Sequence, residues 1–397
     1  MVGGPYDRSA SRRVTTTVDI AVVGAGPAGL AAALLFDRIG YRVALVAPPR
    51  EAADERTSAL LAGSIGLLER IGVWQRLAPE AAPLRTLRIV DGTRRLIRAP
   101  EVTFHAGEID RDAFGYNLRN ATLVAALEAA VADAALLRVV ASAETAVSGA
   151  DEATVRLANG EAITARLVVA ADGRRSPMRD SAGIAVRAWR YDQAALVVNL
   201  RHAEPHDDTS TEFHTEHGPF TLVPLPGNHS SLVWVDRPAA AERRAALPDD
   251  QLAAEIEARS AGLLGAIAIA GKRQVFPLAG MNAARFAKDR IALIGEAAHL
   301  FPPIGAQGLN LGYRDVTALG AILENRPHDP GAPARLAGYQ RARRGDVLAR
   351  TAAVDALNRT LLTGFLPVQA ARGFVLFLLD RVPALRRAVM RQGLAEA

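Results

Sequence analysis

The feature that most constrains this chain is a glycine-rich turn between a strand and a helix near its start. The β-branched run Val18–Val23 is typical of a strand buried on both faces in a parallel sheet. The motif GAGPAG follows at Gly24–Gly29, and an alanine- and leucine-rich helix then continues to a glycine stop at Gly40. The next stretch, YRVALVA, predicts a second buried strand. This strand–helix–strand unit predicts an α/β fold with a parallel sheet.

The spacing of the glycines in this turn is the G-x-G-x-x-G pattern of dinucleotide-binding proteins. Gly24 permits the tight turn, and Gly26 lets the backbone approach a pyrophosphate. Gly29 lets the helix pack close to the strand, so that the amino end of the helix points at the phosphates. We therefore expect a dinucleotide site at Gly24, Gly26, Pro27, Ala28 and Gly29. The alternative is a glycine-rich turn without a ligand.

An acid that usually follows the second strand of such a unit and binds the ribose is missing. The chain has Ala47–Pro49 there, and the spacing of Glu51, Asp54 and Glu55 is wrong for that role. The adenosine end of the site must therefore be held differently. Arg56, in the stretch ERTSAL, is close enough to the turn to meet a phosphate. The alternative is a solvated arginine at a helix start.

A second cluster follows a short buried strand at Leu167–Ala170. The strand runs into Asp172 and Gly173, and Arg174, Arg175 and Arg179 come soon after. An acid and a glycine at a strand end, followed by arginines, form an environment suited to a phosphate and a ribose. A β-turn with a basic surface helix after it fits the same spacing.

The third cluster is LIGEAAHLFPPIGAQGLNLGYRD, from Leu293 to Asp315. It begins with a strand-like run at Ile291–Ile294 and carries little charge and many glycines. Small residues allow a backbone to approach another group closely. His299 in this stretch is more consistent with a structural hydrogen bond than with a catalytic base.

These three motifs, in this order and at these separations, resemble those of the single-component FAD-dependent aromatic monooxygenases related to p-hydroxybenzoate hydroxylase. The resemblance covers roughly residues 18–346. Within that superfamily, ERTSALLAGSIGLLERIGVW, FGYNLRNATLVAAL and PPIGAQGLNLGYRD look most similar to the ubiquinone-biosynthesis hydroxylase branch.

The resemblance implies an FAD site that uses all three motifs. The family's third motif usually has Asp where this chain has Glu296, so the contact with the ribitol and pyrophosphate region must shift. A helix that starts near Gln307 would aim its amide dipoles at the flavin ring. Beyond the five residues of the first turn, the resemblance assigns to the cofactor Arg56, Thr57, Asn120, Asp172, Gly173, Gly295, Glu296, Gly305, Gln307, Gly308, Leu309 and Asn310.

The resemblance also implies a reaction. NADH or NADPH reduces FAD, O2 adds to give a flavin hydroperoxide, and a phenolic ring takes up the distal oxygen, while the protein supplies orientation and a dry pocket. The implied substrate is a polyprenylated ubiquinone precursor, and no catalytic base is identified. One alternative is a related FAD-dependent prenyl reductase or halogenase, although no W-x-W-x-I-P motif occurs. Another is a non-catalytic flavin-binding component of a biosynthetic complex.

The expected fold is a Rossmann-like FAD-binding domain interrupted by an antiparallel β-sheet substrate domain, with a helical C-terminal region. We expect a flexible arm over residues 1–17 and an FAD-binding domain formed by 18–182 and 272–346. Short strands with turn signals predict the substrate domain over 183–271, joined by about 85–104. Residues 347–397 form the helical region.

Histidines gather in the expected substrate domain, and two of them form the stretch HTEH. They are more consistent with exposed polar side chains than with a metal site, because no fourth ligand is evident. No metal is therefore expected. The histidines are His202, His206, His214 and His217.

Composition excludes several other classes of protein. Cysteine is absent, which excludes disulfides and thiolate sites, and Lys+Arg exceeds Asp+Glu by only 47 − 42 = 5. No basic run is dense enough for nucleic acid. With no signal peptide and no apolar run long enough to span a bilayer, a cytoplasmic protein is expected.

The tail over 347–397 combines large apolar residues with arginines. This composition fits a helix in a membrane interface, which would place the protein peripherally at the inner membrane face. It equally fits a helix pair that caps the flavin domain or makes a contact in a homo-oligomer or a biosynthetic complex.

Overall fold

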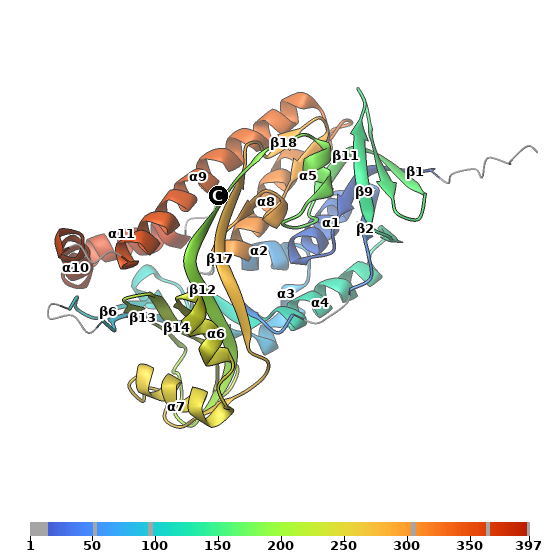
Figure 1. The fold of residues 1–397 in the computed structure, drawn as a ribbon. Coiled ribbons are helices and arrows are strands. Elements are labelled where there is room, and N and C mark those ends of the chain that lie inside the picture. The colour runs from blue at the N-terminus through green and yellow to red at the C-terminus, as the bar shows by residue number, and fades with distance from the viewer. Residues whose placement is uncertain (1–14, 51–53, 94–97, 303–306, 363–365, 395–397) are drawn as a thin grey trace, which may run out of the picture.

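The computed structural model describes residues 15–50, 54–93, 98–302, 307–362 and 366–394. Two large sheets lie side by side, and one long helix runs past both (Figure 1). The first sheet has the strand order β18-β19-β11-β1-β2-β8, with β10 and β9 attached beside β11. Its strands are β1 (Thr15–Val23), β2 (Val43–Ala47), β8 (Leu137–Val140), β9 (Ala143–Ser148), β10 (Ala153–Leu157), β11 (Ala162–Ala170), β18 (Ala287–Lys288) and β19 (Ile291–Leu293).

The centre of the first sheet is the predicted strand–helix–strand unit, which is confirmed. β1 pairs in parallel with β2 on one side and with β11 on the other. Helix α1 (Pro27–Ile39) connects β1 to β2 and ends at Gly40, whose φ of 100° gives the left-handed turn expected at a helix end. The last three residues of the predicted arm belong to β1, because Thr15–Thr17 pair with β11.

Helices cover the first sheet. Helix α1 is buried along most of its length and packs against α4 and α8. The remaining helices around this sheet are α2 (Ala62–Arg70), α3 (Trp74–Leu77), η1 (Ala78–Glu80), α4 (Asn120–Asp133), α5 (Pro177–Ser181), η3 (Gly295–Ala297) and α8 (Gln307–Leu323). A small sheet in the order β3-β7-β4 lies beside them, formed by β3 (Thr57–Leu61), β4 (Ala82–Pro83) and β7 (Gly115–Arg119).

The second sheet has the order β20-β17-β12-β15-β14-β13-β5-β6, with β16 beside β12. It is antiparallel except where β5 pairs with β13. Strand β17 pairs with β12 along much of its length, although the predicted boundary at residue 271 leaves β17 outside this sheet. The strands are β5 (Thr86–Asp91), β6 (Val102–His105), β12 (Val186–His202), β13 (Thr209–Thr215), β14 (Gly218–Leu225), β15 (His229–Asp236), β16 (Ile267–Ile269), β17 (Gln274–Ala283) and β20 (His299–Leu300).

The two faces of the second sheet have different neighbours. Leu196, Phe220 and Trp234 point to one face and form a core with α7 (Asp249–Arg259), next to α6 (Pro238–Ala245). Ala195 and Val235 alternate with them, point to the other face and join the core of the first sheet. The second sheet therefore presents one face toward the first sheet.

The predicted exposed state is wrong for the four histidines, of which His206 and His217 are half-buried. His202 and His214 are buried, and each is hydrogen-bonded. The ring of His202 lies 3.0 Å from the Ser230 hydroxyl, and that of His214 lies 2.9 Å from the Glu212 carboxylate. Within the described ranges, no group of three or more possible metal ligands occurs.

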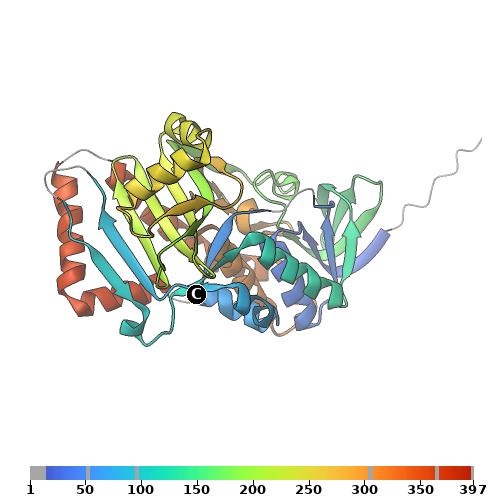
Figure 2. The ribbon, with the colours of Figure 1, turned by 90° about the horizontal axis from the view of Figure 1, so that it is seen from below.

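The C-terminal helices lie beside the second sheet (Figure 2). Helix α9 (Pro333–Leu362) is 30 residues long and is followed by α10 (Leu366–Arg381) and α11 (Pro383–Leu394). Buried Leu376, Leu379 and Met390 pack on β6 and on η2 (Ala106–Ile109). The last two helices therefore cover an edge of the second sheet, which corrects one of the alternatives left open by the sequence, a helix pair that caps the flavin domain.

Candidate active site

The glycine-rich turn leaves open space at only one of its three glycines. A Cβ on Gly24, whose φ is +111°, would lie 2.2 Å from the Ala171 carbonyl oxygen, and one on Gly29 would lie 2.0 Å from that of Gly24. A Cβ on Gly26 would meet nothing within 4 Å. No side chain caps the amino end of α1, so its first backbone N–H groups are available. This combination fits a bound pyrophosphate at Gly26.

The missing acid after β2 is not replaced by Asp54, because the carboxylate of Asp54 is already engaged. The Arg56 guanidinium donates to it twice, at 2.8 Å and 2.7 Å, and the Asn120 amide donates at 2.8 Å. Burial raises the pKa of Asp54, but these donors outweigh burial and hold that pKa below its usual value. The structure thus brings Arg56 and Asn120 together at Asp54. Thr57, which directly follows Arg56, is the first residue of β3.

One basic group lies beside the third motif, and another lies at the glycine-rich turn. The hydrogen bond to Asp54 raises the pKa of Arg56, and the nearby charge of Glu296 adds to that shift. Arg50, three residues after β2, donates 3.0 Å to the Ala25 carbonyl oxygen inside the glycine-rich turn. Many dinucleotide sites have an acid just after the second strand, whereas this chain has the cation Arg50 there.

The third motif touches the first. Gly295 has a φ of +58°, and a Cβ on it would lie 3.5 Å from the Ala28 side chain. A Cβ on Gly312 would lie 3.3 Å from the Gly295 Cα. Glu296 is exposed beside this contact and acts electrostatically on Arg56. Ala28, Gly295 and Gly312 must therefore stay small for α1, η3 and α8 to approach one another.

The start of α8 is fixed to β3 by the Asn310 side chain. Its oxygen accepts from the Leu61 N–H at 2.8 Å and from the Ser64 hydroxyl at 2.6 Å, and its nitrogen donates to the Ala59 carbonyl at 2.8 Å. Asn310 is thus used within the protein. Gly308 is exposed and Leu309 is half-buried in the same turn. Gly305 lies outside the described residues, as does the side chain of Gln307.

Burial within the second motif is uneven, because Asp172 and Gly173 are half-buried, Arg174 and Arg175 are exposed, and Arg179 is buried. One oxygen of Asp172 accepts from the Met178 N–H at 3.0 Å, the other is buried without a partner, and burial raises the pKa of this carboxyl. Gly173 has a φ of +82° and open space beside it. The Arg179 guanidinium is buried and donates to the Ala297 carbonyl at 3.2 Å. Arg179 therefore supports the third motif from inside.

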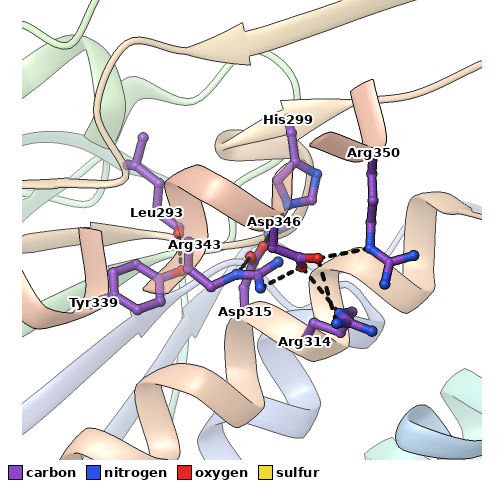
Figure 3. Close-up of polar contacts among 9 residues, drawn as sticks. Leu293, His299, Arg314, Asp315, Tyr339, Arg343, Asp346 and Arg350 are labelled. Atoms are coloured by element: carbon purple, nitrogen blue, oxygen red, sulfur yellow. Dashed lines mark hydrogen bonds and ion pairs between the residues drawn. The ribbon is translucent and has the colours of Figure 1, made fainter. Parts of the chain in front are cut away.

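A buried carboxylate, Asp315, lies under the third motif (Figure 3). One of its oxygens accepts from the Gly295 N–H at 2.9 Å and lies 2.7 Å from the His299 ring, and the other accepts from Arg343 at 2.6 Å. Burial raises the pKa of Asp315, but the charges of His299 and Arg343 outweigh it and the net pKa is lowered. This network orients the turn that carries Glu296.

Helix α9 supplies the other half of the same network (Figure 3). Asp346 accepts from Arg343 at 2.8 Å, from Arg350 at 2.9 Å and from Arg314 of α8 at 3.1 Å. The Tyr339 hydroxyl donates 2.7 Å to the Leu293 carbonyl at the end of β19. The first half of α9 thus ties α8 and β19 together.

Our sequence analysis missed Asp315 and Arg343. A signal for Asp315 exists, because it lies four residues after Leu311 and four before Leu319, both of which are buried. A charged residue in such a stripe needs a partner. The sequence does not identify Arg343 as that partner, since it lies 28 positions away.

Comparison with known proteins also points to an FAD-binding domain. A model of the FAD binding domain family matches residues 17–353. The chain is 34% identical over 402 residues to the ubiquinone hydroxylase UbiL of Rhodospirillum rubrum, covering 98% of this chain and 92% of that protein. It is 33% identical over 392 residues to the 3-demethoxyubiquinol 3-hydroxylase of Escherichia coli, covering 95% and 98%.

Solved structures share the fold. Pseudomonas aeruginosa PqsL in complex with 2-aminobenzoylacetate superimposes with a TM-score of 0.76 at 23% identity, covering 87% of this chain and 97% of PqsL. The p-nitrophenol 4-monooxygenase PnpA of Pseudomonas putida gives 0.77 at 20% identity, covering 96% and 99%. At these identities the similarity establishes the fold alone.

The three glycines of the turn should respond differently to substitution. Gly26→Val should stay folded and lose FAD, because its side chain enters the open phosphate position without meeting the protein. Gly29→Val should unfold or misfold, because its side chain meets the Gly24 carbonyl. Circular dichroism and flavin absorbance of the purified variants separate the two effects. A Gly26→Val protein with full FAD occupancy would rule out the pyrophosphate position.

Asp315→Asn should lower the free energy of unfolding at pH 7 by about 3–5 kcal/mol, because buried Arg343 loses one of its two carboxylate partners and keeps only Asp346. Folding lowers the pKa of Asp315, so its contribution is present above the unfolded pKa of about 3.9 and is lost as pH falls through the folded value. Urea unfolding from pH 7 downward should show the difference between the two proteins shrinking below about pH 4.

The control for this measurement is Asp133→Asn, which removes an exposed carboxylate paired with Arg76 and should cost less than about 1 kcal/mol. An Asp315→Asn protein as stable as this control would contradict the role given to the buried network.

Proposed function

The chain belongs to the FAD binding domain family and is an FAD-dependent monooxygenase, and from this premise we propose that it hydroxylates the aromatic ring of a polyprenylated ubiquinone precursor. The observation that carries the proposal is the 34% identity, across nearly the whole of both chains, with a protein named ubiquinone hydroxylase. The relatives named here are hydroxylases, which does not favour a prenyl reductase, a halogenase or a non-catalytic flavin-binding component.

The residues described here fit FAD at the joined motifs. Gly26 and the amino end of α1 would hold the pyrophosphate, with Arg56 as a nearby cation. Glu296 lies beside this position and would contact the hydroxyl groups of the cofactor. When bound, FAD supplies the redox chemistry, taking hydride from NADH or NADPH and passing one oxygen atom of O2 to the ring.

The protein's own contribution is binding, orientation and exclusion of water. The first turn of α8 is fixed by Asn310, so its free backbone N–H groups point in a set direction toward the expected flavin ring. Residues along β12 and β15 alternate between two faces, one of which packs against α7. The opposite face carries Val197, Asn199 and Val233 and is directed toward the first sheet. We place the substrate ring between this face and α8. A dry pocket there would protect the reaction from water.

The domain boundaries follow from this arrangement. We propose that the FAD-binding part consists of the first sheet with its helices and that the second sheet forms the substrate part. On this division β17 and the β5–β6 hairpin belong to the substrate part.

We further propose that the last two helices contact a membrane surface, where a polyprenylated substrate resides. Exposed large apolar side chains concentrate there, among them Phe374 at 60%, Val375 at 53% and Phe377 at 45%. The Arg381 guanidinium lies over the Phe377 ring, which places a cation beside the apolar surface. Such a mixture suits an interface with anionic lipid. No helix in the described ranges has the length and apolar character needed to cross a bilayer.

Purified protein loaded with FAD should consume O2 and NADH or NADPH faster when a prenylated phenolic ubiquinone precursor is added. The product should gain one oxygen atom that derives from ¹⁸O2, as mass spectrometry would show. Turnover of the same substrate without O2 would indicate a reductase instead. Absence of turnover with FAD fully bound, across a series of such precursors, would contradict the proposed reaction.

The membrane contact is tested by co-sedimentation with liposomes at low salt. Binding should require anionic lipid, weaken as salt is added, and fall sharply in Phe374→Ser/Phe377→Ser and in Arg381→Glu. Arg386 is unsuitable for this test, because it pairs with Glu108 at 2.7 Å inside the protein. Val147→Ser, at a 58% exposed apolar residue of β9, is the matched control. Equal recovery in the supernatant with and without liposomes would remove the proposal.

A further inference from the structure

A cavity of about 680 Å³ opens between the β18 hairpin and the first turns of α9, and none of the candidate cofactor residues lines it. A volume of this size is in the range of small-molecule sites. The turn between β9 and β10 closes one side. The two main walls are the β18 hairpin and helix α9, and their lining residues include Arg285, Lys288, Leu336, Ala337, Gln340 and Arg344.

The cationic side chains that line this cavity differ in whether they already have hydrogen-bond or ion-pair partners. Arg290 is occupied by both oxygens of Asp329, at 2.8 Å and 3.0 Å. Lys288 donates to the Ala182 carbonyl at 2.7 Å and lies 3.4 Å from the Asp289 carboxylate. Arg285 and Arg344 face the cavity from its two walls, and within the described residues neither has a hydrogen-bond or ion-pair partner. Two free guanidinium groups therefore remain.

Apart from Ser148 and the Asp289 carboxylate, which lies 3.4 Å from Lys288, the rest of the lining is mostly apolar. Leu336 and Ala337 of α9 lie opposite Ala287 of β18. The Gln340 side-chain oxygen accepts from the Phe286 N–H at 2.7 Å, which leaves its amide nitrogen as a donor. Guanidinium groups bind phosphate through paired hydrogen bonds. Together these groups match an anion attached to a small apolar body.

We propose that this cavity binds a phosphorylated small molecule, with the phosphate between Arg285 and Arg344 and the organic part against Leu336 and Ala337. A phosphate dianion carries the charge that neutralises both guanidinium groups and offers oxygen atoms to each of them. The apolar wall distinguishes a phosphate ester from inorganic phosphate.

The site has a physical route to the cofactor. Its two walls are already joined by Gln340 to the backbone before β18, and by Tyr339 to Leu293. Arg343, next to Arg344 in α9, binds Asp315, and Asp315 holds the Gly295 N–H. A ligand that bridges the walls binds the folded arrangement of this network and stabilises it by linkage. Its binding should therefore slow FAD release.

The test uses the FAD-loaded protein, with AMP and inorganic phosphate as probes and sodium chloride at matched ionic strength as the background. Titration calorimetry should show AMP binding at least tenfold more tightly than phosphate. At ten times its Kd, AMP should raise Tm by about 1–3 °C. It should also lower the rate of FAD release, followed by flavin fluorescence.

The variants separate this site from general charge effects. Arg285→Glu/Arg344→Glu and the milder Arg285→Gln/Arg344→Gln should each abolish AMP binding while remaining folded, because both side chains are exposed. Arg341→Glu, at an exposed arginine of α9 outside the cavity, should bind AMP as the parent does. Retained AMP binding in both double variants, or equal loss in Arg341→Glu, would overturn the proposal. Equal affinity for AMP and phosphate would overturn the assignment of the apolar wall.

Discussion

The buried carboxylate of Asp315 is the interaction on which the arrangement of the site depends. It joins the Gly295 N–H, the His299 ring and the Arg343 guanidinium, so that one side chain of α8 fixes the turn after β19 and the start of α9. A carboxylate buried this deeply is stable only while its partners remain, because an unpaired charge in the interior is expensive. The turn that carries Glu296 therefore has a single orientation.

Close approach of backbones is the second constraint. Ala28, Gly295 and Gly312 meet where α1, η3 and α8 converge, and Gly24 and Gly29 pack against backbone carbonyls. Gly26, in contrast, has open space beside it. These five small residues satisfy packing of the protein, while Gly26 is the glycine that we propose serves the ligand. The three glycines of the turn therefore have different surroundings in the structure.

The sequence predicts the local parts of this structure well and the long-range parts less well. The strand–helix–strand unit, the antiparallel second sheet and the family follow from runs and motifs that lie close together in the chain. The pairing of Asp315 with Arg343 and the hydrogen bond from Asn120 to Asp54 depend on contacts between distant segments. Periodicity shows that a residue is buried, but it does not show which partner satisfies its charge. The position of α10 and α11 on the second sheet is missed for the same reason.

If the three motifs enclose one FAD molecule, backbone hydrogen exchange will show it. Exchange is compared between the FAD-loaded protein and the same protein after FAD removal. We expect FAD binding to slow exchange in the turn at 24–29, in the turn at 295–297 and in the first turn of α8 together. Slower exchange in the first turn alone, with no change at 295–297 or at the start of α8, would contradict it.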